Sequence, residues 1–307
     1  MASLADRFEI GREPAAGMGL DGTIAYVADD GRSSTIHLLT IGDGGDSVVA
    51  EVPQVVWSVA VSPSGDTIYL LVMDRRSGDD AGVLAVAAVG GPATRLMGPA
   101  PTRATGGNML VAPIAFQGTL IPSLEGGLLA RRVCTSVGGF GCGLDVLDLR
   151  TGEVSLIAGR PSERVTGLSD RFLVTADCAV ELCTTTVTEL ATGAQQAFHG
   201  AFDGSSVTLL DRRLVLASAA RAVDPPGSRI WLTWPDTGEQ RELMQTGGET
   251  LFYLEMGLRW RAVLPAGWIL VERSEPGSVR HLAVWAGDAT SVEIPAPHDE
   301  MPRPPGG

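Results

Sequence analysis

The chain contains no lysine, so all 23 of its basic residues are arginine, and they stand against 36 acidic residues. The formal net charge at pH 7 is −13. An acidic surface keeps a protein soluble and repels phosphate groups. We therefore expect neither a nucleic acid nor an anionic membrane surface among the partners of this protein.

Long apolar runs are also missing, because no stretch approaches the roughly 20 apolar residues that a membrane-spanning helix needs. The first residues, MASLAD, offer neither a basic nor an apolar region, so we do not expect them to be a signal peptide. A signal or membrane anchor ahead of residue 1 is left open. At the other end, residues 296–307 are rich in proline, and we expect a disordered tail or linker there.

Cysteine is scarce, but the four cysteines fall into two close pairs. Each pair brackets a predicted hairpin tip, where two strands come close enough for a disulfide. We predict the bridges Cys134–Cys142 and Cys178–Cys183. Disulfides persist in oxidising compartments, so we expect an extracellular or periplasmic protein or a membrane-tethered ectodomain. A zinc site is one alternative, although the spacing lacks a CxxC knuckle, and buried free thiols are the other.

Six copies of a strand–turn–strand unit recur along the chain. Their turns fall near residues 43, 91, 152, 193, 238 and 287, and the first and last turns are five periods apart, so the mean period is about 49 residues. The clearest turns are Thr151-Gly152, Thr192-Gly193 and Thr237-Gly238. Another apolar strand precedes each turn, at residues 23–27, 67–72, 128–133, 172–175, 214–217 and 268–271.

Several repeats contain one more strand upstream, most clearly at residues 56–61, which makes four strands per period. Four strands per repeat are typical of a propeller blade. No window sustains the apolar spacing of a capped amphipathic helix. We therefore predict an all-β fold, a six-bladed β-propeller of four-stranded antiparallel blades, as a single domain over residues 1–295.

The turn Ser62-Pro63-Ser64-Gly65-Asp66 lies between two of these strands. Proline presets φ for such a turn, and glycine adopts positive φ without strain. The surrounding segment, WSVAVSPSGDTIYL, resembles the strand–SPDG–strand element of PD40 repeats in the TolB-like and WD40-like propeller superfamily. The resemblance covers one repeat and implies the fold. It does not choose a function, because propellers include hydrolases, lyases, receptors and scaffolds.

Propeller strands are named A to D from the axis outward, and the B–C and D–A connections of all blades lie on one face. Here we predict long B–C loops at residues 74–81, 134–142, 219–228 and 273–279 and short A–B and C–D turns. Long loops on a rigid scaffold are where binding sites usually lie. We predict a binding face that contains Arg75, Arg76, Asp79, Asp80, Phe140, Tyr253, Glu255, Arg259 and Trp260. Packing between blades is the alternative role for the aromatic residues.

The motifs of known propeller enzymes are missing. There is no Ser-x-Asp-x-Gly-x-x-Trp box of the sialidase kind, and a lactonase-type calcium site needs several asparagines where this chain has only Asn108. The four histidines, His37, His199, His281 and His298, fall on outer strands or the tail. We therefore expect no metal and no cofactor.

Two functions follow from these observations. The first is a non-enzymatic, extracytoplasmic binding or scaffold propeller that recognises a protein or glycan through its long-loop face. The second is a carbohydrate- or peptide-active enzyme, a lyase or hydrolase, with carboxylates and arginine in the axial funnel. An enzyme should bring two or more carboxylates with shifted pKa values together in one pocket.

Overall fold

The computed structural model describes residues 16–18, 23–40, 45–77, 79–100, 103–104, 117–135, 141–157, 163–177, 184–199, 205–223, 226–248, 250–254 and 267–294. Within these ranges the chain forms 25 strands and no helix. The predicted all-β class is confirmed.

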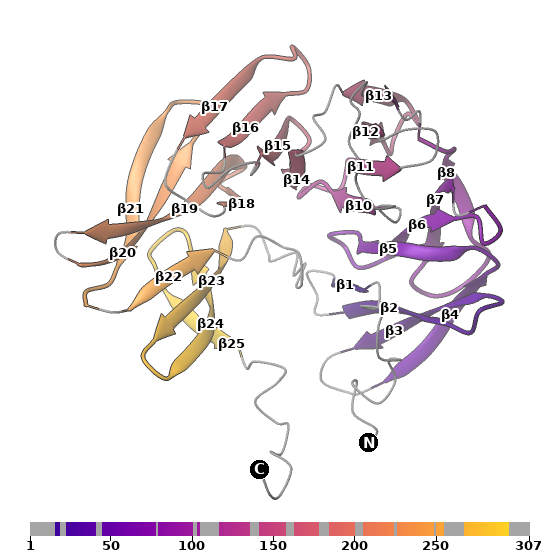
Figure 1. Ribbon diagram of the computed structural model, residues 1–307, viewed down its shortest axis with the longest axis horizontal. Coiled ribbons are helices and arrows are strands. Elements are labelled where there is room, and N and C mark those ends of the chain that lie inside the picture. Colours follow the sequence, from indigo (N-terminus) through magenta and orange to yellow (C-terminus); the bar gives the residue numbers. More distant parts are fainter. Residues whose placement is uncertain are drawn as a thin grey trace, which may run out of the picture. The chain divides into compact units, whose positions relative to one another are not determined.

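The strands form six sheets, each built from strands that are consecutive in sequence (Figure 1). The first contains β1 (Ala16–Met18), β2 (Thr23–Asp29), β3 (Ser34–Thr40) and β4 (Asp46–Val52). The second contains β5 (Val55–Val61), β6 (Thr67–Met73), β7 (Asp80–Ala87) and β8 (Thr94–Met97). The third contains β10 (Gln117–Pro122), β11 (Leu128–Thr135), β12 (Gly141–Asp148) and β13 (Val154–Ile157), and the short β9 (Arg103–Ala104) pairs with β12 as a fifth strand.

The other three sheets have four strands each. The fourth contains β14 (Glu163–Leu168), β15 (Phe172–Asp177), β16 (Thr184–Glu189) and β17 (Gln195–His199). The fifth contains β18 (Ser205–Leu210), β19 (Arg213–Val223), β20 (Pro226–Trp234) and β21 (Glu239–Gln245). The sixth contains β22 (Leu251–Leu254), β23 (Trp268–Glu275), β24 (Ser278–Trp285) and β25 (Ser291–Ile294). Six sheets agree with the six predicted repeats, and a count of six blades around one axis stays a prediction.

The chain divides into two compact units. The first comprises residues 1–177, 188–194 and 259–263, and the second comprises residues 178–187, 195–258 and 264–307. The first three sheets lie in the first unit, and the last two lie in the second. That residues 1–295 form a single propeller stays a prediction, and residues 296–307 lie outside the described residues.

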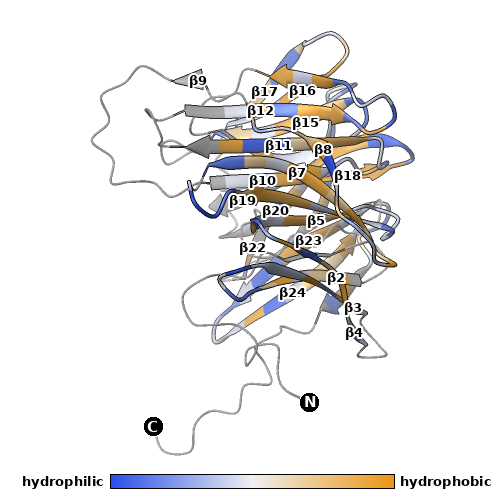
Figure 2. Ribbon diagram, turned by 90° about the vertical axis from the view of Figure 1, so that its right-hand side faces the viewer, coloured by the Kyte–Doolittle hydropathy of each residue, from blue (hydrophilic) through white to orange (hydrophobic). Residues whose placement is uncertain are grey.

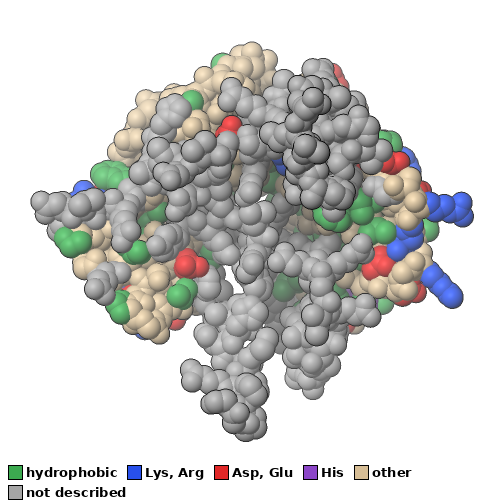
Figure 3. Space-filling model, in the orientation of Figure 1, with side chains coloured by type: hydrophobic (Ala, Val, Ile, Leu, Met, Phe, Trp, Pro, Cys, Tyr) green, Lys and Arg blue, Asp and Glu red, His purple; other side chains and the backbone are tan. Residues whose placement is uncertain are grey.

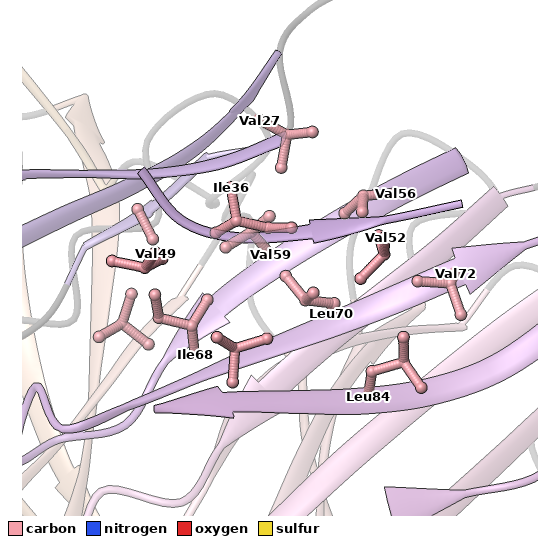
Figure 4. Packing of buried hydrophobic residues seen from close by; sticks show 13 residues of the cluster. Val27, Ile36, Val49, Val52, Val56, Val59, Ile68, Leu70, Val72 and Leu84 are labelled. Carbon is pink, nitrogen blue, oxygen red and sulfur yellow. The ribbon is translucent and has the colours of Figure 1, made fainter. Parts of the chain in front are cut away.

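Within each unit, apolar residues fill the space between consecutive sheets. The strand β6 has the sequence TIYLLVM, in which every residue after Thr67 is apolar. Its residues Ile68, Leu70 and Val72 pack with the first sheet (Figure 4). Its residues Tyr69, Leu71 and Met73 pack with the third sheet. Because successive side chains point to opposite faces, a strand that is covered on both faces is apolar at nearly every position. Hydrophobic colour accordingly follows the strands in Figure 2, and hydrophilic colour gathers at many of the turns.

Three C–D turns have the predicted Thr-Gly form. Gly152, Gly193 and Gly238 have φ of +74°, +71° and +71°. In each turn the threonine Oγ1 accepts a hydrogen bond from the backbone N–H of the residue after the glycine, at 3.2, 3.2 and 3.3 Å. The sixth turn differs, because Ala289 adopts positive φ there and Gly287 does not.

Two of the predicted long loops are paired strands. Residues 219–223 of β19 pair with residues 226–230 of β20, so the segment 219–228 is mostly an extended hairpin. The strands β23 and β24 pair up to Glu275 and Ser278, which leaves a tight two-residue turn in place of the loop predicted at 273–279. Both predictions were wrong because the glycines and prolines taken as loop signals lie at the tips and edges of hairpins.

Candidate functional site

The structure describes the side chains of four of the nine predicted binding residues: Arg75, Arg76, Asp79 and Asp80. Phe140, Glu255, Arg259 and Trp260 lie outside the described residues. Tyr253 belongs to β22, and its side chain also lies outside the description. Arg75, Arg76 and Asp79 come from one B–C connection, between β6 and β7, and Asp80 is the first residue of β7.

This connection is a compact turn with a carboxylate cap. The Asp74 Oδ1 accepts hydrogen bonds from the backbone N–H groups of Arg76 and Ser77, both at 2.9 Å. These two bonds lower the pKa of Asp74. The side chains of Arg76 and Asp79 are exposed. Arginine side chains likewise project at the rim of the first unit, beside acidic ones (Figure 3). The turn therefore offers the exposed Arg76 and Asp79 to a partner, and hydrogen bonds hold its backbone at Arg76 and Ser77.

Arg75, in contrast, binds inside the protein. Its Nη1 and Nη2 donate to Asp29 Oδ1 and Oδ2 at 3.1 and 2.6 Å, the bidentate geometry of a strong arginine–carboxylate pair. Its Nε donates to the carbonyl oxygen of Pro53 at 2.8 Å, and its Nη2 lies 3.2 Å from that of Gln54. Arg75 thus joins the end of β2 and the β4–β5 connection to the second sheet, which is a structural role.

Asp29 carries the anion of this pair. Burial raises its pKa, but hydrogen bonds from Arg75, the Ser34 hydroxyl and the backbone N–H of Gly31 outweigh that effect and lower the pKa to about 2. The Ser34 hydroxyl lies 2.7 Å from Asp29 Oδ2. Asp29 therefore stays charged and bound to Arg75 at any pH above its unfolded value of 3.8.

Asp80 is buried, with 8% of its surface exposed. Its Oδ1 accepts from the backbone N–H of Gly82 at 2.8 Å, and its Oδ2 accepts from the backbone N–H of Ala100. The guanidinium of Arg131 lies 3.6 Å from the same Oδ2. Asp80 is thus engaged within the fold and is not offered to a partner, unlike its neighbour Asp79.

Arg131 and Asp145 form a second bidentate pair. They are 2% and 1% exposed, and they stand directly opposite each other on β11 and β12. The Nε and Nη2 of Arg131 donate to the two carboxylate oxygens of Asp145 at 3.0 and 2.6 Å. The Nη1 donates to the carbonyl oxygen of Gly98 at 2.5 Å. The prediction from sequence missed both residues, although a charge inside an apolar strand was a visible signal.

The same hairpin carries one predicted disulfide. Cys134 and Cys142 are directly opposite each other in the register of β11 and β12. Directly opposed residues of antiparallel strands have Cα atoms about 4.5–5.5 Å apart, which is within the range that a disulfide needs. The bridge itself stays a prediction. Cys178 and Cys183 lie outside the described residues.

Among the described residues, no group of three or more His, Cys, Asp or Glu side chains is placed to hold a metal ion. No helix long and apolar enough to cross a membrane occurs in the same part of the chain.

No protein-family model and no curated protein sequence matches the chain. Solved structures do match. An uncharacterized protein of Listeria monocytogenes has a TM-score of 0.58 at 10% identity, over 92% of this chain and 82% of that one. A prolyl endopeptidase has a TM-score of 0.58 at 12% identity, over 91% and 41%. An oligogalacturonate lyase in complex with manganese has a TM-score of 0.53 at 13% identity, over 96% and 86%.

At such identities the likeness concerns the fold alone. The fold that the predicted resemblance implied, an all-β arrangement of four-stranded antiparallel sheets consistent with a propeller, agrees with this likeness. The chain spans about two fifths of the peptidases it matches first, 40% of one and 41% of another. Since the similar structures include peptidases and a lyase, the fold accommodates enzymes as well as binding proteins.

Proposed function

We propose that this chain is a non-enzymatic, extracytoplasmic binding or scaffold propeller, which recognises a protein or a glycan through its B–C and D–A connections. The observation that carries the proposal is the turn at residues 74–79. Its backbone is held by Asp74 and anchored by Arg75, while Arg76 and Asp79 stay exposed. A partner that binds such a turn does not have to order it first, and this lowers the entropic cost of association.

The carboxylates with lowered pKa values support the same proposal. Asp30, Asp74, Asp148 and Asp288 each accept backbone N–H bonds within their own turn, and these bonds lower the pKa of each. Such groups stabilise turns. A general acid for glycoside or peptide chemistry needs a raised pKa, close to the working pH.

The alternative, a lyase or hydrolase, has one observation in its favour. Partial burial raises the pKa of Glu125, whose Oε2 accepts from the backbone N–H of Asp170 at 2.9 Å. The carboxylate of Asp170 is itself occupied by the Ser123 hydroxyl at 2.7 Å and the backbone N–H of Gly127 at 3.1 Å. The carboxylate that neighbours Glu125 is therefore engaged within the fold, and we favour the binding function.

The test uses immobilised panels of defined oligosaccharides and unstructured peptides as probes. We expect the chain to bind at least one probe and the double variant Arg76→Ala/Asp79→Ala to bind it about tenfold more weakly or worse, because anchors of this kind dominate binding energy. The melting temperature should stay nearly unchanged, since both side chains are exposed. Glu153→Ala, at an exposed C–D turn, is the matched control and should bind as the wild type does.

Two results would contradict the proposal. One is binding that follows Glu153 and ignores the double variant. The other is product formation from oligogalacturonate in the presence of manganese, or from proline-containing peptides, which would establish the enzymatic alternative.

The extracytoplasmic location rests on the cysteines. We expect native protein to contain no titratable thiol and to have a mass about four hydrogens below that of the reduced chain. Peptide mapping without reductant should link Cys134 with Cys142 and Cys178 with Cys183. Each bridge closes a short loop and should contribute about 2–3 kcal/mol. Free thiols in protein that was produced under oxidising conditions would remove this support for the location.

A further inference from the structure

One hydrogen bond recurs where the chain passes from one sheet to the next. A buried side chain at or near the start of a C strand accepts a backbone N–H from the first strand of the following sheet or from the segment that leads into that sheet. The Ser34 Oγ accepts from Val56 at 3.2 Å. The Asp80 Oδ2 accepts from Ala100, and the Ser228 Oγ accepts from Phe252. The three acceptors are 0%, 8% and 2% exposed. Their burial means that water does not replace them.

In the first unit, an arginine of the following sheet holds the same segments by their carbonyl groups. Arg75 donates to the carbonyl oxygens of Pro53 and Gln54, three and two residues before Val56. Arg131 donates to that of Gly98, two residues before Ala100. Each arginine is also fixed by a bidentate carboxylate, on Asp29 and Asp145 respectively. In each of the segments 53–56 and 98–100, side chains thus bind both a backbone N–H group and at least one backbone carbonyl group.

We propose that these contacts form two interblade clamps, with Arg75 and Arg131 as positioning residues. The first clamp consists of Arg75, Asp29 and Ser34, and the second of Arg131, Asp145 and Asp80. Each holds a D–A segment against the next sheet at the base of the long-loop face. The first also fixes the turn 74–79, because Arg75 belongs to it. That last consequence rests on the proposed function, whereas the clamps themselves do not depend on any ligand.

The planar guanidinium explains why both positions are arginine. Each must bind a carboxylate through two parallel bonds and still reach a carbonyl group of the D–A segment. Lysine offers a single point charge and does not reproduce this fork. The charge on Asp80 is compatible with burial because Arg131 and two backbone N–H groups face it.

The experiment is hydrogen exchange of the full-length chain without any ligand, followed peptide by peptide. In Arg75→Ala and in Arg75→Lys, we expect exchange of the peptide that contains Val56 to rise about tenfold, because loss of the carbonyl bonds permits local opening. Arg76→Ala, one residue further on, is the matched control and should leave that peptide unchanged. In Asp80→Ala the rise should occur at Ala100, and in Ser228→Ala it should occur at Phe252. Peptides of β6 at residues 68–71 should keep their protection in all of these variants.

A uniform rise across the peptides of β6 would overturn the proposal, since it would indicate global destabilisation and no local clamp. Unchanged exchange at Val56 in Arg75→Ala, or full protection in Arg75→Lys, would overturn it as well. These outcomes are independent of the binding test, in which only Arg76 and Asp79 are altered. A failed clamp and a failed binding function are therefore distinguishable.

Discussion

Replacing Arg131 by methionine should lower the free energy of unfolding by about 3–5 kcal/mol, because the change leaves the buried carboxylate of Asp145 without a countercharge. Asp80 would lose the nearest cation at the same time. Methionine preserves most of the apolar stem of arginine, so the loss reports the charge and its hydrogen bonds more than packing. Denaturant unfolding, with the slope checked for two-state behaviour, measures it.

The double variant Arg131→Met/Asp145→Leu should recover a large part of this loss. A buried ion pair that is replaced as a whole by apolar residues of similar volume is often neutral or stabilising, because two desolvated charges disappear together. Arg150→Ala removes an exposed pair with Asp148 and serves as the control, for which we expect little change. A double variant as unstable as Arg131→Met would show that the arginine contributes by its shape and by its bond to Gly98 and not by balancing charge.

The fold could be predicted because its determinants are local. The B strand β6 is apolar from Ile68 to Met73, since sheets cover both of its faces. The Thr-Gly turns occur where glycine must adopt positive φ. These signals lie within a few residues of one another, so one sequence suffices to find them.

The clamps could not be predicted in the same way. Asp29 and Arg75 are 46 residues apart, and they meet only because consecutive sheets pack face to face. The contact of Asp80 with Arg131 likewise depends on how the second and third sheets pack against each other. Sequence alone placed Arg75 and Asp80 on an open binding face, whereas burial and hydrogen bonding give them structural roles.

One of these contacts, between Arg131 and Asp145, could have been predicted from the sequence. Pairing Cys134 with Cys142 in the predicted hairpin fixes the register of its two strands, and the same register places Arg131 opposite Asp145. A salt bridge between β11 and β12 therefore follows from the predicted disulfide. The burial of this pair does not follow, because it depends on the neighbouring sheet.

Gly82→Ala should be the most damaging single-methyl change in the first unit. Gly82 lies in β7 with φ of +105°, a backbone conformation that strains other residues. A Cβ atom there would stand 2.2 Å from the carbonyl oxygen of Met97, which is backbone and therefore has no rotamer to yield. Backbone strain costs about 1–3 kcal/mol, and overpacking costs about 1–3 kcal/mol in the same direction. We therefore expect the free energy of unfolding to fall by about 3 kcal/mol or more.

Gly227 repeats this arrangement in the second unit. It lies near the start of β20, and its Cβ would stand 2.1 Å from the carbonyl oxygen of Thr246, so Gly227→Ala should cost a similar amount. The matched control is Gly152→Ala, at φ of +74° with nothing within 4 Å of the new Cβ. Only conformational strain of about 1 kcal/mol applies there. Thermal and denaturant unfolding of the three variants separates the contributions. Suppose that Gly82→Ala lowers the free energy of unfolding no more than Gly152→Ala does. In that case the close approach of β7 to the end of β8 does not explain why glycine stands at position 82.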